Sequence, residues 1–283
     1  MPSTDAHAAD PAELVIDPPG RWTGLELREL WAHRELIYFL TKRELQVRYK
    51  QSFFGVSWAV LQPLTFAFIF ALFFGQLAPL PTEGFPYAVF AIVALVPWQF
   101  ASQSMTNGAN SLVQDADLIS KVYFPRLALP LSKGLSLLLD LVIAMGVVLL
   151  VMWAYGVGIA SEVYLVPFFL LLVLVASFAV ATLLAAVNVK YRDIAVIVPT
   201  VVQIGFFISP ILYSGNDLVP EEWRTVWAIN PMVGAIGGLR WSLIGASYPG
   251  TLEIAISCAS ALVILVVALW YFRRTERFFA DVI

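Results

Sequence analysis

Residues 162–187 read EVYLVPFFLLLVLVASFAVATLLAAV, and this stretch decides the class of fold. After Glu162 it contains no charged residue. About 20 apolar residues in an α-helix cross the roughly 30 Å hydrocarbon core of a bilayer, because the helix rises about 1.5 Å per residue. The stretch therefore predicts a membrane-spanning helix.

Five further stretches have the same character. They cover residues 53–75, 86–108, 127–153, 195–214 and 252–272. Of the 283 residues, 60% are hydrophobic and only 13% are charged, and the mean hydropathy is +0.80. A soluble domain carries about 25% charged residues. The sequence thus predicts an all-α, polytopic membrane protein with six transmembrane helices.

The second of these spans is unusual, because Pro97 interrupts it and its end is polar. Gln99, Ser102, Gln103 and Ser104 follow the proline. Polar groups at this depth have to be buried in protein or face water. We therefore expect this half of the span to avoid lipid.

The positions of Lys and Arg orient the helices, because cytoplasmic segments carry the excess of positive charge. With the N-terminus inside, residues 1–52, 109–126, 188–194 and 273–283 hold fourteen of the 17 cationic side chains. Both termini are therefore expected in the cytoplasm. The first 20 residues lack the basic start and apolar core of a signal peptide. We interpret 1–22 as a disordered cytoplasmic tail and 274–283 as a C-terminal tail.

Residues 23–52 are predicted to form an interfacial amphipathic helix. Apolar residues such as Trp31 alternate there with Arg34 and other cations. Such a helix lies in the headgroup plane, with its apolar side in the acyl boundary and its cations at phosphates. Thr41 and Glu44 have capping-box spacing, so the helix is expected to restart there. The alternative is a solvated helix next to the membrane.

Two charged loops project from the cytoplasmic side. In the first, Ser111 and Gln114 have capping-box spacing, and Asp115 and Asp117 fall where a helix dipole favours anions. A helix is therefore expected over 110–122, and Pro125 ends it. The second loop runs from Asn188 to Asp193. Both suit the grip of a partner protein, although they could also be simple polar turns.

The outer segment 215–251 is too long for a turn and too apolar for a soluble loop. Pro220 marks one helix start, and Asn230 with Pro231 marks a second. The small residues of the second helix, including Gly238, suit close packing. We predict a re-entrant hairpin in the outer leaflet, which is a candidate gate because such backbone has to pack on protein or line a cavity.

Catalytic motifs are missing from the sequence. There is no GxxxxGK[ST] loop for nucleotide phosphates, no GxSxG, HExxH or CxxC motif, and no basic patch for nucleic acid. Cys258 is interpreted as a small apolar residue. Asp140 is the one convincing ionisable group within a span, and we favour an interhelical hydrogen bond to a neighbouring span over a pore-lining or proton-coupled role. The aromatic residues near the outer end suit either an interfacial belt or the lining of a glycan exit.

Four motifs in order resemble one family of transporters. They are 43–50 with 54–58 and 61–63 (REL, VRYK, FGVSW, LQP), 117–130 (DLI, KVYFPR, LP), 188–193 (NVKYRD), and 230–240 (NP, GLR). The chain from about residue 25 to 283 resembles ABC-2 type permeases that export lipid-linked polysaccharides, the O-antigen, teichoic-acid and capsule group (the Wzm type).

This resemblance implies a homodimeric permease in the bacterial cytoplasmic (inner) membrane that works with two ABC ATPase subunits. It implies that the partner ATPase binds ATP and Mg and that this chain binds no cofactor or metal. The transmembrane domain would cover 53–273, and an ATP-driven dimer channel would pass the glycan. The alternatives are an ABC-2 permease for a drug or small lipid, an ion-coupled transporter, and a membrane enzyme of lipid-glycan metabolism.

The resemblance also assigns roles to residues. ATPase coupling falls on residues in the two loops: Asp115, Asp117, Lys121, Tyr191, Arg192 and Asp193. Substrate entry falls on the interfacial helix: Trp31, Arg34, Arg43, Arg48 and Tyr49. A channel or gate role falls on Trp58, Asp140, Trp223, Gly238, Arg240 and Trp241.

Overall fold

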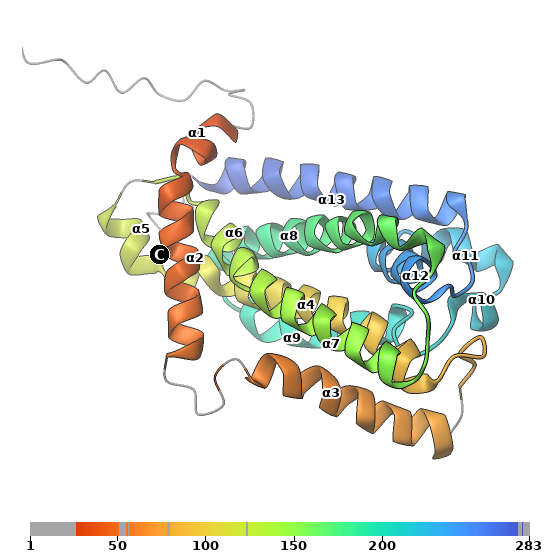
Figure 1. The fold of residues 1–283 in the computed structure, drawn as a ribbon. Helices are drawn as coiled ribbons and strands as arrows, with labels where there is room; N and C mark the ends of the chain where they lie inside the picture. Colours follow the sequence, from red (N-terminus) through yellow and green to blue (C-terminus); the bar gives the residue numbers. More distant parts are fainter. Residues whose placement is uncertain are drawn as a thin grey trace, which may run out of the picture.

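The computed structural model describes residues 27–50, 55, 57–77, 80–122, 124–276 and 279. Within these ranges the chain is helical and contains no strand, which confirms the all-α prediction. The predicted N-terminal tail, 1–22, lies outside the described residues. Figure 1 shows a bundle of long, roughly aligned helices with one helix, α2, lying across one end.

Five helical segments in the described ranges are long and apolar enough to cross a membrane. They are α3 with the π-turn η1 (Ser57–Leu72 and Phe73–Leu77), α4 (Tyr87–Gln114), α6 with α7 (Ala128–Ser136 and Leu138–Ala154), η2 with α8 (Ser161–Leu165 and Val166–Lys190), and α13 (Thr251–Glu276). They correspond to five of the six predicted spans.

The remaining predicted span, 195–214, forms a shorter helix. Helix α9 (Ile194–Ile208) has 15 residues and ends before Ser209, whose backbone is extended. At about 1.5 Å per residue such a helix covers roughly 22 Å, less than the hydrocarbon core. A sixth complete crossing therefore stays a prediction.

Helices α4 and α8 form the centre of the bundle. Every residue of α4 from Tyr87 to Trp98 is buried, and Gly108 of α4 lies so close to Ala181 of α8 that a Cβ atom on the glycine would be 2.7 Å from the alanine. Helix α4 runs through Pro97 without a break, so the predicted interruption is wrong. At the polar end of α4, Ser104 is buried, and Gln99, Ser102 and Gln103 are partly buried.

The outer end contains α10 (Gly215–Leu218), α11 (Glu221–Trp227) and α12 (Pro231–Ile244). The predicted cap of α12 is confirmed, because the Asn230 side chain accepts a hydrogen bond from Met232 N at 3.0 Å and Pro231 follows it. Twelve of the fourteen residues of α12 are buried, against α8, α13 and α4. Helix α12 is thus packed on protein, whereas no residue of α11 is buried, and the re-entrant hairpin stays a prediction.

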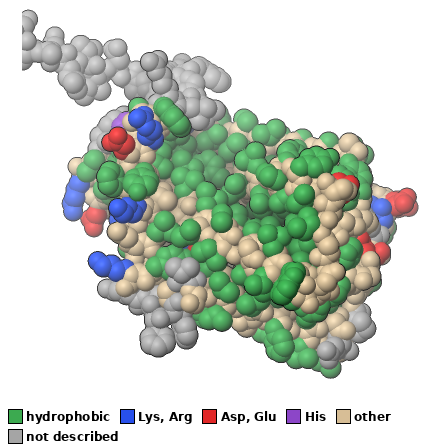
Figure 2. Space-filling view, in the orientation of Figure 1, with side chains coloured by type: hydrophobic (Ala, Val, Ile, Leu, Met, Phe, Trp, Pro, Cys, Tyr) green, Lys and Arg blue, Asp and Glu red, His purple; other side chains and the backbone are tan. Residues whose placement is uncertain are grey.

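The surface separates apolar and charged side chains. In Figure 2 hydrophobic side chains cover the middle of the visible face, and the charged side chains gather towards its two ends. Helix α13 exposes apolar side chains, among them Val263 and Val266 at 61% and 63% exposure. An exposed apolar band of this kind suits lipid rather than water.

Candidate functional site: a charged corner, a polar pocket and an outer hairpin

The corner where α2 crosses the bundle contains most of the predicted site residues. A short helix, α1 (Leu27–Ala32), precedes α2 (Arg34–Tyr49), and the break falls at His33. The predicted restart at Thr41 is wrong, because its hydroxyl donates to Ile37 O at 2.8 Å inside a continuous helix. At the α1–α2 break Trp31 is 72% exposed, with the Arg34 guanidinium 5.9 Å from its ring centroid.

Four charged side chains form a network between α2, α6 and the end of α4. Arg43 binds Asp115 at 2.5 Å and Glu44 at 3.1 Å. Lys133 of α6 lies 2.9 Å from Glu44 and 3.6 Å from Asp115. The two carboxylates and Lys133 are between 10% and 16% exposed, so water screens these pairs weakly.

Electrostatics reinforce this network. Burial would raise the pKa of Glu44, but hydrogen bonds from Lys133 and Arg43 outweigh it and lower that pKa below its ordinary value. Burial would lower the pKa of Arg43, but its bonds to Asp115 and Glu44 raise it. Both shifts favour the charged forms of Glu44 and Arg43.

One turn further along α2, Arg48 and Tyr49 reach α7. Arg48 Nη1 lies 2.5 Å from Asp140 Oδ2, its other nitrogen donates to Ser136 at 3.2 Å, and the Tyr49 hydroxyl donates to Asp140. Asp140 stands in the first turn of α7, where the helix dipole favours an anion. Asp140 thus makes an interhelical hydrogen bond, but its partner is the crossing helix α2 and not the neighbouring span that we expected.

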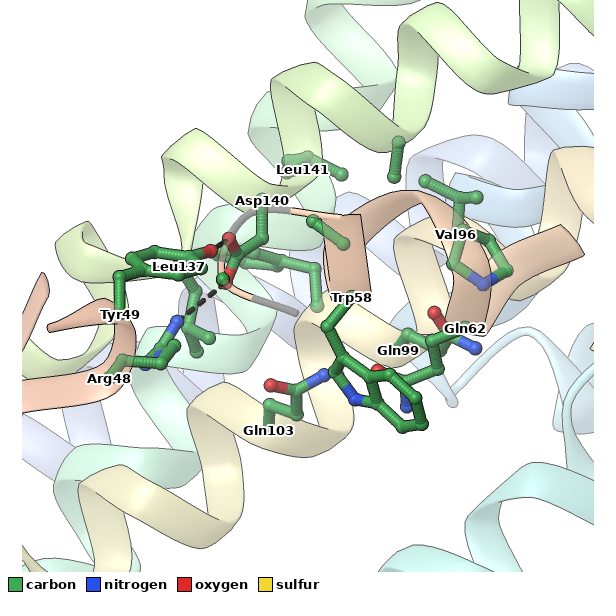
Figure 3. A pocket seen from close by; sticks show the side chains of 15 residues that line it. Arg48, Tyr49, Trp58, Gln62, Val96, Gln99, Gln103, Leu137, Asp140 and Leu141 are labelled. Atoms are coloured by element: carbon green, nitrogen blue, oxygen red, sulfur yellow. Dashed lines mark hydrogen bonds and ion pairs between the residues drawn. The ribbon is translucent and has the colours of Figure 1, made fainter. Parts of the chain in front are cut away.

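A pocket of about 120 Å³ opens beside this ion pair (Figure 3). Its polar wall combines Arg48, Tyr49 and Asp140 with Trp58 and Gln62 of α3 and Gln99 and Gln103 of α4. Figure 3 shows Trp58 close to the three glutamines. Trp58 was predicted as a channel residue and Arg48 as an entry residue, and the fold brings both to one pocket.

The first cytoplasmic loop differs from its prediction. Helix α4 continues to Gln114, where Ser111 donates to Gly108 O at 2.7 Å, so the capping box at Ser111 is wrong. The loop helix is α5 (Ala116–Lys121) and it ends before Pro125. Asp117 and Lys121 point outward, at 97% and 73% exposure, whereas Asp115 turns inward to the network.

The second cytoplasmic loop, 191–193, is held near the first. Tyr191, Arg192 and Asp193 are exposed. Asn188, at the end of α8, is buried and donates to Ala109 O at 2.9 Å. Its amide thereby fixes the position of the second loop relative to α4.

In the outer hairpin, Arg240 is a structural residue. It is 3% exposed, and its guanidinium donates to four backbone carbonyls at 2.6–3.1 Å: those of Phe90, Pro210, Ile211 and Tyr213. It also lies 3.6 Å from the centroid of the Phe90 ring. The Arg240 side chain is thus almost completely buried, and its predicted channel or gate role stays a prediction.

The other predicted gate residues occupy different environments. Gly238 packs against Phe169 of α8, where a Cβ atom would overlap the ring. Trp241 is half-buried between Phe169 and Tyr248, whereas Trp223 is 61% exposed. Only Trp223 of these three presents a large exposed surface.

Sequence reasoning gave no site role to Lys133 or Glu83, and it treated Glu44 only as a capping-box partner of Thr41. Glu83 has a positive φ of 56°, and its carboxylate accepts from Ser214 Oγ at 2.5 Å and from Ser247 N at 2.6 Å. It thereby joins three outer loops. Lys133 and Glu44 were visible as charges near apolar segments, but their pairing over 89 positions has no local signal.

The described residues contain no group of three His, Cys, Asp or Glu side chains arranged to hold a metal ion. The fold is that of a multi-pass membrane protein with a charged corner at one end and the buried helix α12 at the other. The chain belongs to the ABC-2 type transporter family, whose family model matches residues 35–244.

The relatives narrow the class to transport subunits. The chain is 31% identical over 256 residues to an O-antigen export system permease protein from Myxococcus xanthus, covering 90% of this chain and 98% of the relative. It is 30% identical over 253 residues to a protein of the same name from Klebsiella pneumoniae, covering 88% and 95%. A second Klebsiella pneumoniae protein of that name is 28% identical over 251 residues.

Proposed function

We propose that this chain is the membrane permease of an ATP-driven exporter that moves lipid-linked polysaccharide across the bacterial cytoplasmic membrane. The observation that carries the proposal is near full-length similarity to permeases named for O-antigen export. The apolar band and the charged corner support it, because a permease needs both a lipid-facing bundle and a surface for its energy source.

The energy source in this proposal is a separate ABC ATPase, present in two copies beside a dimer of this chain. The sequence has no phosphate-binding loop, so ATP and Mg are assigned to the partner. The exposed residues of α5 and of loop 191–193 form the proposed docking surface. In this arrangement both termini are cytoplasmic, and α9 completes the sixth crossing.

The path of the substrate is proposed from the two ends of the helix bundle, the charged corner at α2 and the outer hairpin. The lipid-linked glycan enters beside α1 and α2. The exposed Trp31 of α1 and Arg34 of α2, whose guanidinium lies over the Trp31 ring, suit the boundary between headgroups and acyl chains. It leaves past the outer hairpin, near the exposed Trp223. ATP binding and hydrolysis on the partner would move the dimer halves between the closed and open states.

Deleting the gene in the source bacterium tests the proposal. We expect surface polysaccharide to disappear and lipid-linked glycan to accumulate in the cell, with recovery when the gene is restored. The purified chain alone should not hydrolyse ATP. Unchanged surface polysaccharide would contradict the substrate, and a loss of resistance to small apolar compounds alone would favour a drug or lipid exporter.

A further inference from the structure

The pocket beside Asp140 has a composition that no role assigned so far explains. Three carboxamides converge there: Gln62 from α3, and Gln99 with Gln103 one turn apart on α4. Carboxamides are costly in a membrane bundle unless hydrogen bonds satisfy them. Gln99 Nε2 is buried and has no hydrogen-bond partner among the described residues. A buried donor of this kind calls for an acceptor beyond the described residues.

The charge of the pocket limits what such a ligand can be. Among the described residues Arg48 is the one cation that lines the pocket, and Asp140 neutralises this cation at 2.5 Å. The lining therefore carries no net charge, which disfavours a phosphate or another anion as ligand. Carboxamides donate and accept hydrogen bonds without charge, as hydroxyl groups require.

Shape and aromatic content narrow the ligand further. Trp58 lies one helical turn before Gln62 on α3, so its indole flanks the carboxamides, and it is 55% exposed. The apolar C–H face of a sugar ring can lie on an indole while its hydroxyls reach neighbouring amides. The volume of about 120 Å³ is well below that of sites for drug-sized molecules, about 300–1,000 Å³, and suits one ring rather than a chain.

We propose that this pocket binds one neutral sugar ring of the exported glycan through Trp58, Gln62, Gln99 and Gln103. The proposal rests on the glycan substrate proposed above. The pocket would then recognise the sugar part of the substrate at the entry side, next to α2. The ion pair between Arg48 and Asp140 holds the wall of the pocket in place.

The test uses the complex of this chain with its ATPase, purified in nanodiscs without nucleotide. Saturation-transfer NMR would measure binding of the methyl glycosides of glucose, galactose and mannose, with inorganic pyrophosphate as an anionic probe. We expect binding of at least one hexoside, about tenfold weaker in Gln99→Leu or Gln103→Leu and in Trp58→Leu, and retained in Trp58→Phe. Gln114→Leu, the same change at the exposed end of α4, should bind as the unchanged chain does.

Three results would overturn the proposal. They are no hexoside binding by a folded complex, hexoside binding that all of these variants retain, and a preference for pyrophosphate at this pocket. Trp58→Leu keeps the test valid if a glutamine variant fails to fold, because Trp58 is largely exposed. If gene deletion abolishes surface polysaccharide and the complex still ignores hexosides, only this inference fails; if deletion leaves the polysaccharide unchanged, the proposed function fails.

Discussion

Replacing Lys133 by Met removes the cation that lies between Glu44 and Asp115 and keeps most of the side-chain volume. The Lys133 ammonium is 2.9 Å from Glu44 and 3.6 Å from Asp115, and its side chain is 10% exposed. Breaking one side of a buried ion pair costs about 3–5 kcal/mol. Because both carboxylates keep Arg43 and some exposure, we expect about 2–3 kcal/mol.

Thermal unfolding of the purified chain in nanodiscs measures this loss. For chains of roughly this size 1 kcal/mol shifts Tm by about 2–4 °C, so Lys133→Met should lower Tm by about 4–12 °C. The matched control is Lys121→Met, whose partner Asp117 lies 3.9 Å away with both side chains largely exposed. Such a pair contributes little, so its Tm should barely move. Equal shifts in the two variants would refute the reasoning.

Two further measurements separate charge from packing. Adding Glu44→Gln to Lys133→Met should restore part of the lost stability, because it removes the carboxylate left with too few cations. The lowered pKa of Glu44 means that its ion pairs stabilise the fold above about pH 4.5 and that this stability is lost as the pH falls through the lowered folded-state value. The difference between Lys133→Met and the unchanged chain should therefore shrink in acid.

Four other predictions concern single residues. Asp117→Lys should lower ATPase activity in the complex without lowering Tm, and normal activity would count against docking at α5. Gly238→Ala should lower Tm because of its overlap with Phe169, and Phe169→Leu should recover part of the loss; Gly238→Trp should yield no folded protein, which excludes it as a test of gating. Arg240→Lys should destabilise the chain by about 3 kcal/mol or more, since an ammonium cannot reach four carbonyls. An unchanged Tm would contradict the stabilising role of the four hydrogen bonds of Arg240. Asp140→Asn should fold and retain export, because an amide can still accept from Arg48, whereas a folded variant without export would indicate a role in transport.

Local chemistry explains which parts of the fold the sequence predicted. Five spans follow from the length of the apolar stretches alone. The backbone of a segment that crosses lipid has to satisfy its own hydrogen bonds, which an α-helix does. The cap of α12 follows from the pair Asn230–Pro231, because each residue acts within one turn. The ends of helices failed where a tertiary environment overrides a local preference. Ser111 and Thr41 bond to carbonyls of their own helices instead of starting new ones.

The charged corner was beyond sequence reasoning for a different reason. Arg43 and Asp115 were both selected as functional residues, but as parts of different surfaces: one for substrate entry and the other for the ATPase. They are joined at 2.5 Å although 72 positions separate them. The charge pattern predicts which residues require a partner of opposite charge. The packing of α2 on α6 determines which partner each of them contacts.

Two ion clusters one turn apart bind α2 to the helices of the third span. The first joins Arg43 and Glu44 to Lys133 of α6, and the second joins Arg48 and Tyr49 to Asp140 of α7. At about 1.5 Å per residue the two clusters lie roughly 7 Å apart along α2. The helix is therefore held at two points, which opposes a tilt about either of them. Asp115 adds the start of the α5 loop to the first cluster. A displacement of α5 would therefore move α2 and the α2-facing end of the third span together, because a separate movement of either has to break partly buried ion pairs.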